Sequence, residues 1–146
     1  MTNTLTFTVH GIPAPQGSKR HLGRGILVES SKKVKPWRQD VKYQALALKP
    51  ADWVTAAPVA MSVVFRFQRP KSHFNKSGLR SSAPLECTSA SHGDIEKLVR
   101  STNDALNGVL FDDDRQVVSL VATKRYCEGN EPPGAIITLT ALTPSE

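Results

Sequence analysis

The chain has 146 residues, and its 19 Lys or Arg residues outnumber its 13 Asp or Glu residues, which gives a formal net charge of +6. This length suits a single domain over residues 1–146, and no apolar run approaches the ~20 residues of a membrane-spanning helix. The N-terminus lacks the basic and apolar regions of a signal peptide, so we expect a cytoplasmic protein with no membrane partner. The positive charge favours an anionic partner, with nucleic acid first, although many small basic proteins bind none.

A strand and a turn open the chain. Leu5, Phe7 and Val9 alternate with threonines, and this period of two predicts a β-strand. The glycines and prolines of residues 11–17 then end the strand, because they favour tight turns and deny hydrogen-bond donors to a sheet.

A basic segment follows the turn. Residues 19–38 hold seven Lys or Arg residues and a single acid, Glu29. We expect a turn at residues 23–25 and a returning strand at residues 25–28, which together form a hairpin. Such a hairpin either positions DNA phosphates or is an ordinary solvated surface, and the charge alone favours neither interpretation. The candidate DNA-binding residues here are Lys19, Arg20, Lys32, Lys33 and Lys35.

The next two predicted elements are a helix and a strand. Pro36 fits the first position of a helix that runs to about residue 48, with an apolar face formed by Trp37, Val41, Ala45 and Leu48. Trp37 lies on this face, so we expect it in the core rather than stacked on a base. The strand is predicted over residues 59–68, with its odd-numbered side chains in the core.

Residues 69–84 carry four cations, no acid and no periodicity, which predicts a mobile basic loop. A loop without function is the alternative, but its position just before a group of acids favours contact with DNA. The candidate DNA-binding residues of this loop are Arg69, Lys71, Lys76 and Arg80.

Six of the thirteen acids lie between residues 94 and 114. Like charges repel unless a cation offsets them, and Mg²⁺ prefers carboxylate oxygens. Apolar spacing predicts a helix from Asp94 to Asn107, with Asp94 as its N-cap and Glu96 in its first turn. Taken singly, capping alone would explain Asp94, and the preference of a helix for an acid in its first turn would explain Glu96. A second acidic cluster, residues 112–114, precedes a predicted strand. We expect this strand to run back alongside the helix, so that both clusters bind one cation.

The chain ends in two predicted strands, at residues 116–126 and 135–142, which we expect to form an antiparallel hairpin. The whole order of elements predicts an α+β fold, in which two main helices pack on one face of a small mixed sheet. The four histidines and two cysteines show no metal-ligand spacing, and His92 is expected to be a loop histidine.

Three sequence blocks carry a resemblance to a known family. They are Asp-Ile-Glu-Lys-Leu-Val-Arg from residue 94, Asp-Ala-Leu-Asn-Gly from residue 104 and Asp-Asp-Arg-Gln-Val from residue 113. In order and spacing they resemble the RusA family of Holliday junction resolvases. The segment Pro-Gln-Gly-Ser-Lys-Arg from residue 15 is similar to the basic N-terminal loop of phage-type members, in which case the protein would act in the host cell cytoplasm.

The resemblance implies a RusA-like fold and a homodimer that binds four-way DNA junctions. It also implies Mg²⁺-assisted, symmetric nicking of two strands in DNA recombination and repair. By position, Asp94 and Glu96 match two catalytic carboxylates, and Asp113 and Asp114 match a pair of aspartates. The implied metal ligands are Asp94, Glu96 and Asp114, with Asp113 assisting. Arg100 stands where the family usually has lysine, and it would stabilise charge on phosphate.

Two other functions fit the same residues. A DNA-junction-binding module with weakened catalysis is favoured by the two departures from the family pattern, Glu96 in place of aspartate and Arg100 in place of lysine. A structural Ca²⁺ site is the other alternative, but neither acidic cluster has the loop spacing of an EF-hand, so it ranks last.

Overall fold

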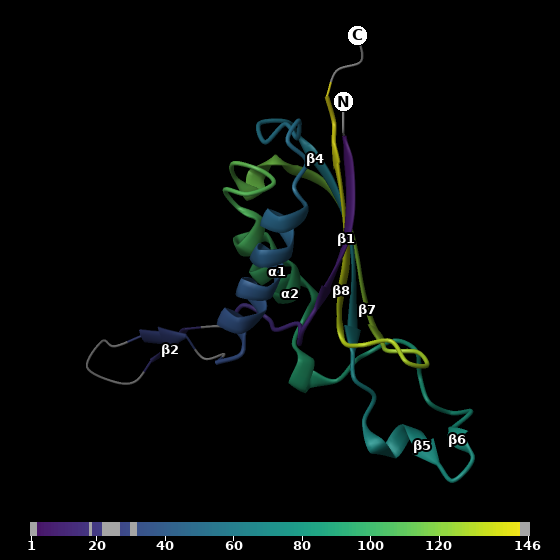
Figure 1. Ribbon diagram of the computed structural model, residues 1–146. Coiled ribbons are helices and arrows are strands. Elements are labelled where there is room, and N and C mark those ends of the chain that lie inside the picture. Colours follow the sequence, from purple (N-terminus) through teal and green to yellow (C-terminus); the bar gives the residue numbers. More distant parts are fainter. Residues whose placement is uncertain (1–2, 18, 22–26, 30–31, 144–146) are drawn as a thin grey trace.

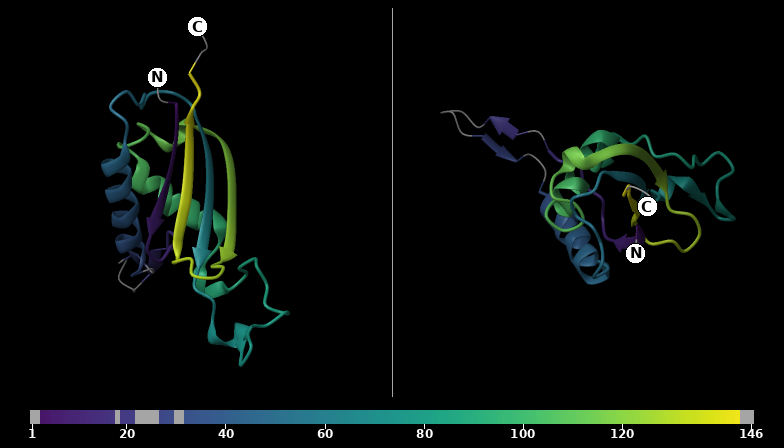
Figure 2. Two further views of the ribbon diagram at one scale, coloured as in Figure 1. Left: turned by 45° about the vertical axis from the view of Figure 1, so that its right-hand side comes forward. Right: turned by 90° about the horizontal axis from the view of Figure 1, so that it is seen from above.

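The computed structural model describes residues 3–17, 19–21, 27–29 and 32–143, with only the backbone for residues 19–21 and 27–29. Four strands form a mixed sheet in the order β1-β8-β4-β7, and the helices α1 and α2 cover one of its faces (Figures 1 and 2). The predicted α+β fold is therefore confirmed. The main elements are β1 (Thr4–His10), α1 (Val34–Leu48), β4 (Val59–Phe67), α2 (Ile95–Leu106), β7 (Val117–Tyr126) and β8 (Gly134–Ala141).

The core lies between the sheet and the two helices. The odd-numbered residues of β4 are all buried, as their alternation predicted. On α1, Trp37, Val41 and Ala45 are buried, but Leu48 is exposed, so its assignment to the apolar face was wrong. Leu48 is the last residue of the helix, and Val34 provides the buried contact of the first turn instead. None of the described helices is both long and apolar enough to span a membrane.

Trp37 joins the two helices, as expected for a core residue. Its indole Nε1 donates a hydrogen bond to Thr102 Oγ1 of α2 at 3.1 Å, and both side chains are buried. A buried indole N–H without a partner would cost free energy, so this bond fixes the register of α1 against α2.

The last two strands do not form the predicted hairpin. β8 pairs antiparallel with both β1 and β4, whereas β7 pairs parallel with β4 and forms an edge of the sheet. The connection between them crosses the end of β4, where the Cys127 N–H donates to the Phe67 carbonyl. β8 carries buried residues along nearly its whole length, which suits a strand that is paired on both sides.

Two short hairpins extend from the lower end of the body (Figure 1). β2 (Lys19–His21) pairs antiparallel with β3 (Leu27–Glu29), which confirms the hairpin, while its predicted turn at residues 23–25 lies outside the described residues. β5 (Phe74–Asn75) pairs with β6 (Gly78–Leu79), with a 3₁₀ turn η1 (Lys71–His73) before them. The predicted loop over residues 69–84 thus contains a short hairpin, in which Asn75 Oδ1 accepts the Ser77 N–H and fixes a tight turn.

Candidate active site

The first acidic pair lies at the start of α2. Asp94 is the N-cap and Glu96 lies in the first turn, as predicted, and both residues are exposed. However, the Asp94 side chain accepts no capping hydrogen bond within this described turn. Because capping does not occupy the carboxylate, both acids present oxygens to solvent beside the positive end of the helix dipole.

Backbone contacts fix the position of this helix start. Gly93 has a φ of 86°, and a Cβ built there would lie 2.5 Å from Pro15, so the close approach and the left-handed backbone both require glycine. The Gly93 carbonyl accepts a hydrogen bond from Lys124 Nζ at 2.8 Å, which ties the helix start to the far end of β7. The Gln16 N–H donates to the Lys97 carbonyl at 2.9 Å, so the segment that leads to β2 is held against the same turn.

His92 lies beside the acidic pair. Its ring stacks on Phe67 with a centroid distance of 4.3 Å, so it is packed rather than loose in a loop. Burial lowers the pKa of His92, and the charges of Lys33 and Lys124 lower it further. These two lysines therefore act on the space around the start of α2, where an anion would gain from both of them.

The second acidic cluster is a turn held by Gln116. The Gln116 Oε1 accepts the N–H groups of Asp112 and Asp113, both at 2.9 Å. Its Nε2 donates to the carbonyls of Thr55 and Ala57, both at 2.8 Å. One side chain thus makes four hydrogen bonds, which fix the acidic turn to the connection before β4.

Asp113 has a structural contact in this turn. Its Oδ1 accepts the Arg115 N–H at 2.9 Å and so caps η3 (Asp114–Gln116), the 3₁₀ turn that precedes β7. The hydrogen bond from Arg115 lowers the pKa of the Asp113 carboxyl. Asp114 follows Asp113 directly, and both side chains are exposed to solvent.

Asp104, which was not among the predicted site residues, belongs to the second cluster. Burial raises the pKa of the Asp104 carboxyl, and the negative charge of Asp114 raises it further. The Arg38 guanidinium, with a terminal nitrogen 3.7 Å from Asp104 Oδ2, lowers it. Arg100 lies one turn earlier on α2 and also acts on Asp104. The sequence signal for Asp104 was present, since it begins the second of the three resembling blocks.

The structure does not bring the two acidic clusters together within one chain. α2 has 12 residues, so Asp94 and the end of the helix are about 18 Å apart. Lys124, which contacts Gly93, is seven residues beyond the start of β7, or about 23 Å. Among the described residues, no three His, Cys, Asp or Glu side chains form a group that could hold a metal ion. The expectation that both clusters share a cation in one chain was wrong, because β7 begins beside the end of α2 and not beside its start.

The predicted DNA-binding lysines before α1 are exposed where their side chains are described. Lys32, Lys33 and Lys35 all face solvent at the start of the helix. The side chains of Lys19 and Arg20 lie outside the described part, although their backbone forms β2. In the second hairpin, Lys71, Lys76 and Arg80 are exposed as well.

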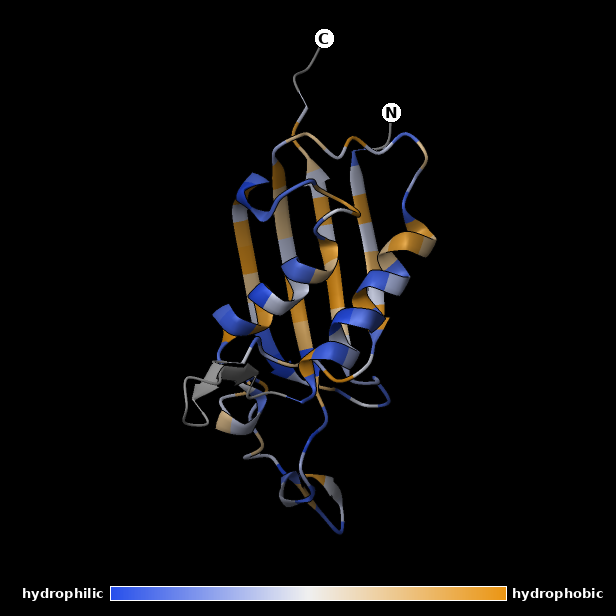
Figure 3. Ribbon diagram, turned by 90° about the vertical axis from the view of Figure 1, so that its left-hand side faces the viewer, coloured by the Kyte–Doolittle hydropathy of each residue, from blue (hydrophilic) through white to orange (hydrophobic). Residues whose placement is uncertain are grey.

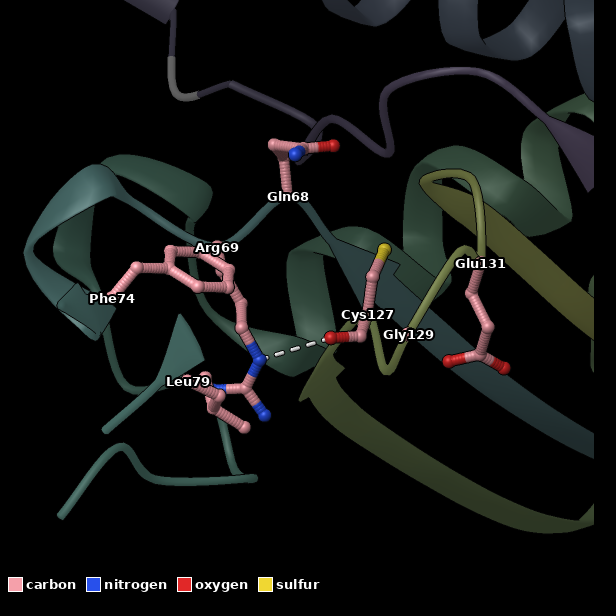
Figure 4. Close-up of a pocket in the computed structure, with 7 residues that line it drawn as sticks. All are labelled: Gln68, Arg69, Phe74, Leu79, Cys127, Gly129 and Glu131. Carbon is pink, nitrogen blue, oxygen red and sulfur yellow. Dashed lines mark hydrogen bonds between the residues drawn. The ribbon is translucent and has the colours of Figure 1, made fainter. Parts of the chain in front are cut away.

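The guanidinium of Arg69 anchors the second hairpin to the end of β7. Its Nε donates to the Cys127 carbonyl at 3.0 Å, and both residues line a cavity of about 160 Å³ (Figure 4). One terminal nitrogen donates to the Pro84 carbonyl at 2.7 Å, and the group lies 5.5 Å from the centre of the Tyr126 ring. A phosphate would have to compete with these contacts.

Comparison with known proteins gives two findings. The family model described as endodeoxyribonuclease RusA matches residues 10–140 of the chain. A protein of Bacillus subtilis (strain 168), described as uncharacterized protein YqaN, is 32% identical over 127 residues, which cover 85% of this chain and 89% of that protein. The matched region includes both acidic clusters and both basic hairpins.

Proposed function

The chain belongs to the RusA family of endodeoxyribonucleases, and on this basis we propose that it resolves four-way DNA junctions by paired, symmetric nicks in recombination and repair. Family membership makes it a crossover junction endonuclease. The proposal adds that residues 1–146 act as one domain in a homodimer, and that Asp94, Glu96, Asp113, Asp114 and Arg100 are the catalytic residues.

The proposal rests mainly on the cationic side chains that surround Asp94 and Glu96. Both basic hairpins extend from the end of the body at which α2 begins (Figure 1). Lys33 and Lys124 act on His92, two residues before Asp94. Asp94 and Glu96 are therefore exposed carboxylates inside a basic surface, an arrangement in which cations bind DNA phosphates and acids lie next to the backbone.

We propose Mg²⁺ as the cofactor, with Asp94, Glu96 and Asp114 as ligands. Carboxylate oxygens are the ligands that Mg²⁺ prefers, and the bound ion would polarise a phosphate and activate water. The acids of one chain do not fit a shared ion, since Asp114 lies about 20 Å from the other two by the helix and strand lengths. No catalytic step is therefore assigned to an ion within a single chain.

Arg100 and the basic hairpins have separate roles in the proposal. Arg100 is exposed on α2, one helical turn after Glu96, and its guanidinium would stabilise charge on a phosphate oxygen. Lys19, Arg20, Lys32, Lys33 and Lys35 on one side, and Arg69, Lys71, Lys76 and Arg80 on the other, would hold two arms of a junction. Structure selectivity then comes from the fixed geometry of two such surfaces and not from base contacts.

The test is cleavage of an end-labelled four-way junction with and without Mg²⁺, analysed on a denaturing gel. We expect Asp94→Asn to reduce cleavage by about 100-fold or more and to leave junction binding intact, because the substitution removes a charged ligand without changing size. Asp40→Asn is the matched control, since Asp40 is an exposed acid on α1. Full cleavage by Asp94→Asn would exclude the proposed site. If the wild-type protein binds the junction and makes no nicks, the binding module is the correct alternative.

A further inference from the structure

The second hairpin carries two exposed apolar side chains on a basic segment. Phe74 and Leu79 are paired across β5 and β6, and they are 44% and 51% exposed. Figure 3 shows the hairpin below the body of the protein, mostly in hydrophilic colours with a short hydrophobic stretch. Neither residue belongs to the buried core, and a cross-strand pair of this kind stabilises a hairpin only slightly. Packing within the domain therefore does not account for the pair.

These two side chains form one wall of the cavity of about 160 Å³ that Arg69 also lines. Figure 4 shows them to the left, with Cys127, Gly129 and Glu131 of the connection between β7 and β8 to the right. Pockets for drug-sized ligands hold about 300–1,000 Å³, so this smaller cavity suits a single ring system. An apolar wall that contains an aromatic ring is a surface on which a planar group stacks.

The cavity wall is fixed to the body of the protein. Besides the contacts of Arg69, the Arg80 N–H donates to the His73 carbonyl at 2.8 Å, which closes the base of the hairpin. The His73 and Tyr126 rings pack edge to face, with 4.8 Å between their centroids. Because these contacts already hold the hairpin against the end of β7, a ligand would enter a preformed site and lose less conformational entropy on binding.

Positive charge surrounds the cavity. Three arginines and one glutamate act on the Cys127 thiol in its wall, namely Arg66, Arg69, Arg125 and Glu131. Two of these arginines donate hydrogen bonds to the glutamate, which offsets its charge. The remaining charge is positive, and the exposed Lys71 and Lys76 of the hairpin add to it. Cations around an apolar cavity suit a nucleobase whose neighbouring phosphates stay outside.

The cavity lies next to the start of α2. Gln68, which lines it, directly follows Phe67 in the chain. The Phe67 ring stacks on the ring of His92, two residues before Asp94. A base in the cavity would therefore belong to DNA that passes close to the first acidic pair.

We propose that this cavity binds one unpaired nucleobase of a four-way junction, stacked on the Phe74 ring, while the DNA strand continues past Asp94 and Glu96. Base pairs at the open centre of a junction have lost a stacking neighbour, so a base leaves the helix there at a lower cost than within an arm. Stacking accepts any base, so the contact adds selectivity for structure without reading sequence. The junction as the source of the base rests on the proposed function, whereas binding of the base does not require cleavage.

The contact is tested by photo-cross-linking. Four-way junctions that carry iodouracil at each base beside the exchange point in turn are irradiated with the wild-type protein in the absence of Mg²⁺. We expect the cross-linked peptide, identified by mass spectrometry, to contain Phe74. The yield should be about tenfold lower when iodouracil lies in the middle of an arm, where opening a base pair costs more. Cross-links only outside the cavity, or equal yields at the two kinds of position, would overturn the proposal.

Affinity measurements separate stacking from a structural role of the ring. Phe74→Ala should weaken junction binding about tenfold and leave the affinity for an intact duplex unchanged, because stacking is lost and the phosphate contacts remain. Phe74→Tyr keeps the ring and should bind the junction as the wild type does. Tyr43→Ala, at an exposed aromatic residue of α1, is the matched control and should change neither affinity.

The outcomes distinguish the base site from the proposed cleavage. If Phe74→Ala weakens binding of both DNAs equally, or of neither, the cavity binds no base. If the wild type shows the expected cross-link and affinities but makes no nicks with Mg²⁺, the proposed function fails and the base site stands.

Discussion

The side chain of Gln116 makes hydrogen bonds that allow the effect of its removal to be predicted. Its side chain uses both acceptor positions and both donors, with four bonds of 2.8–2.9 Å to the backbone of the acidic turn and of the connection before β4. Gln116→Ala removes all four bonds and leaves two N–H groups and two carbonyls without these partners. Water reaches the exposed turn and can replace part of them, because Asp112 and Asp113 are exposed.

The expected loss of stability follows from the number of hydrogen bonds that Gln116→Ala removes. A hydrogen bond contributes a net ~1 kcal/mol, and the two bonds to the exposed turn contribute less because water substitutes for them. We therefore expect Gln116→Ala to lower the free energy of unfolding by about 2–3 kcal/mol. Gln116→Glu should cost at least as much, because a carboxylate oxygen would face the Thr55 or Ala57 carbonyl in place of a donor. Activity should fall further than stability alone explains, because Asp113 and Asp114 lose their fixed position.

The assay is urea unfolding followed by circular dichroism, with junction cleavage measured well below the unfolding transition. Gln39→Ala is the matched control, since Gln39 is an exposed glutamine on α1. A loss below 0.5 kcal/mol, expressed as about a twofold change in the folding constant, together with unchanged cleavage, would refute the assigned role of Gln116.

Two further predictions concern charge. Hydrogen bonds from Arg125 and from the Glu128 N–H lower the pKa of Glu131 to about 2 from an ordinary value near 4.5, so its contribution to stability is complete above pH 4.5 and is lost as the pH falls towards 2. Glu131→Gln should lower the free energy of unfolding by about 1–3 kcal/mol at pH 7, since buried Arg66 also loses its charged partner. In thermal melts, the difference in stability between the variant and the wild type should close near pH 2. A difference that persists unchanged at pH 2 would contradict the assigned role of Glu131. Replacing both Lys76 and Arg80 with alanine should weaken junction binding and reduce the slope of log affinity against log salt concentration by about 2. The control is Lys49→Ala, at the end of α1, which should leave the slope unchanged. If a fluorescence titration gives the double variant the wild-type slope, the second hairpin does not contact DNA.

Local patterns predicted the helices and strands, because each depends on the spacing of apolar residues along a few turns. The period of two in β4 places its predicted residues in the core, and so does the stripe of α2 from Leu98 to Leu106, although Ile95 at its start is only half-buried. The caps of α2 were also predictable, since Asp94 precedes the apolar run and Gly108, with a φ of 80°, follows it. In each case the signal lies within about 15 residues.

The pairing of the strands could not be predicted in the same way. Whether β7 pairs with β8 or with β4 depends on contacts between distant residues, and a seven-residue connection permits either. The location of the acidic turn was wrong for a related reason: β7 runs back alongside α2, as expected, but it begins beside the end of the helix, so Asp114 lies near Asp104 and not near Asp94. The role of Gln116 was also missed, since four hydrogen bonds to the backbone leave no periodic signal in the sequence.

The most direct test of the whole account uses a supercoiled plasmid with an extruded cruciform, incubated with wild-type protein and Mg²⁺. Paired nicks on opposite sides of the junction convert this plasmid to a full-length linear product, whereas single nicks leave an open circle. We predict linear product from the wild type and none from Asp94→Asn. Open circles alone, or linear product from Asp94→Asn, would contradict a two-site junction endonuclease built on the acids at the start of α2 and before β7.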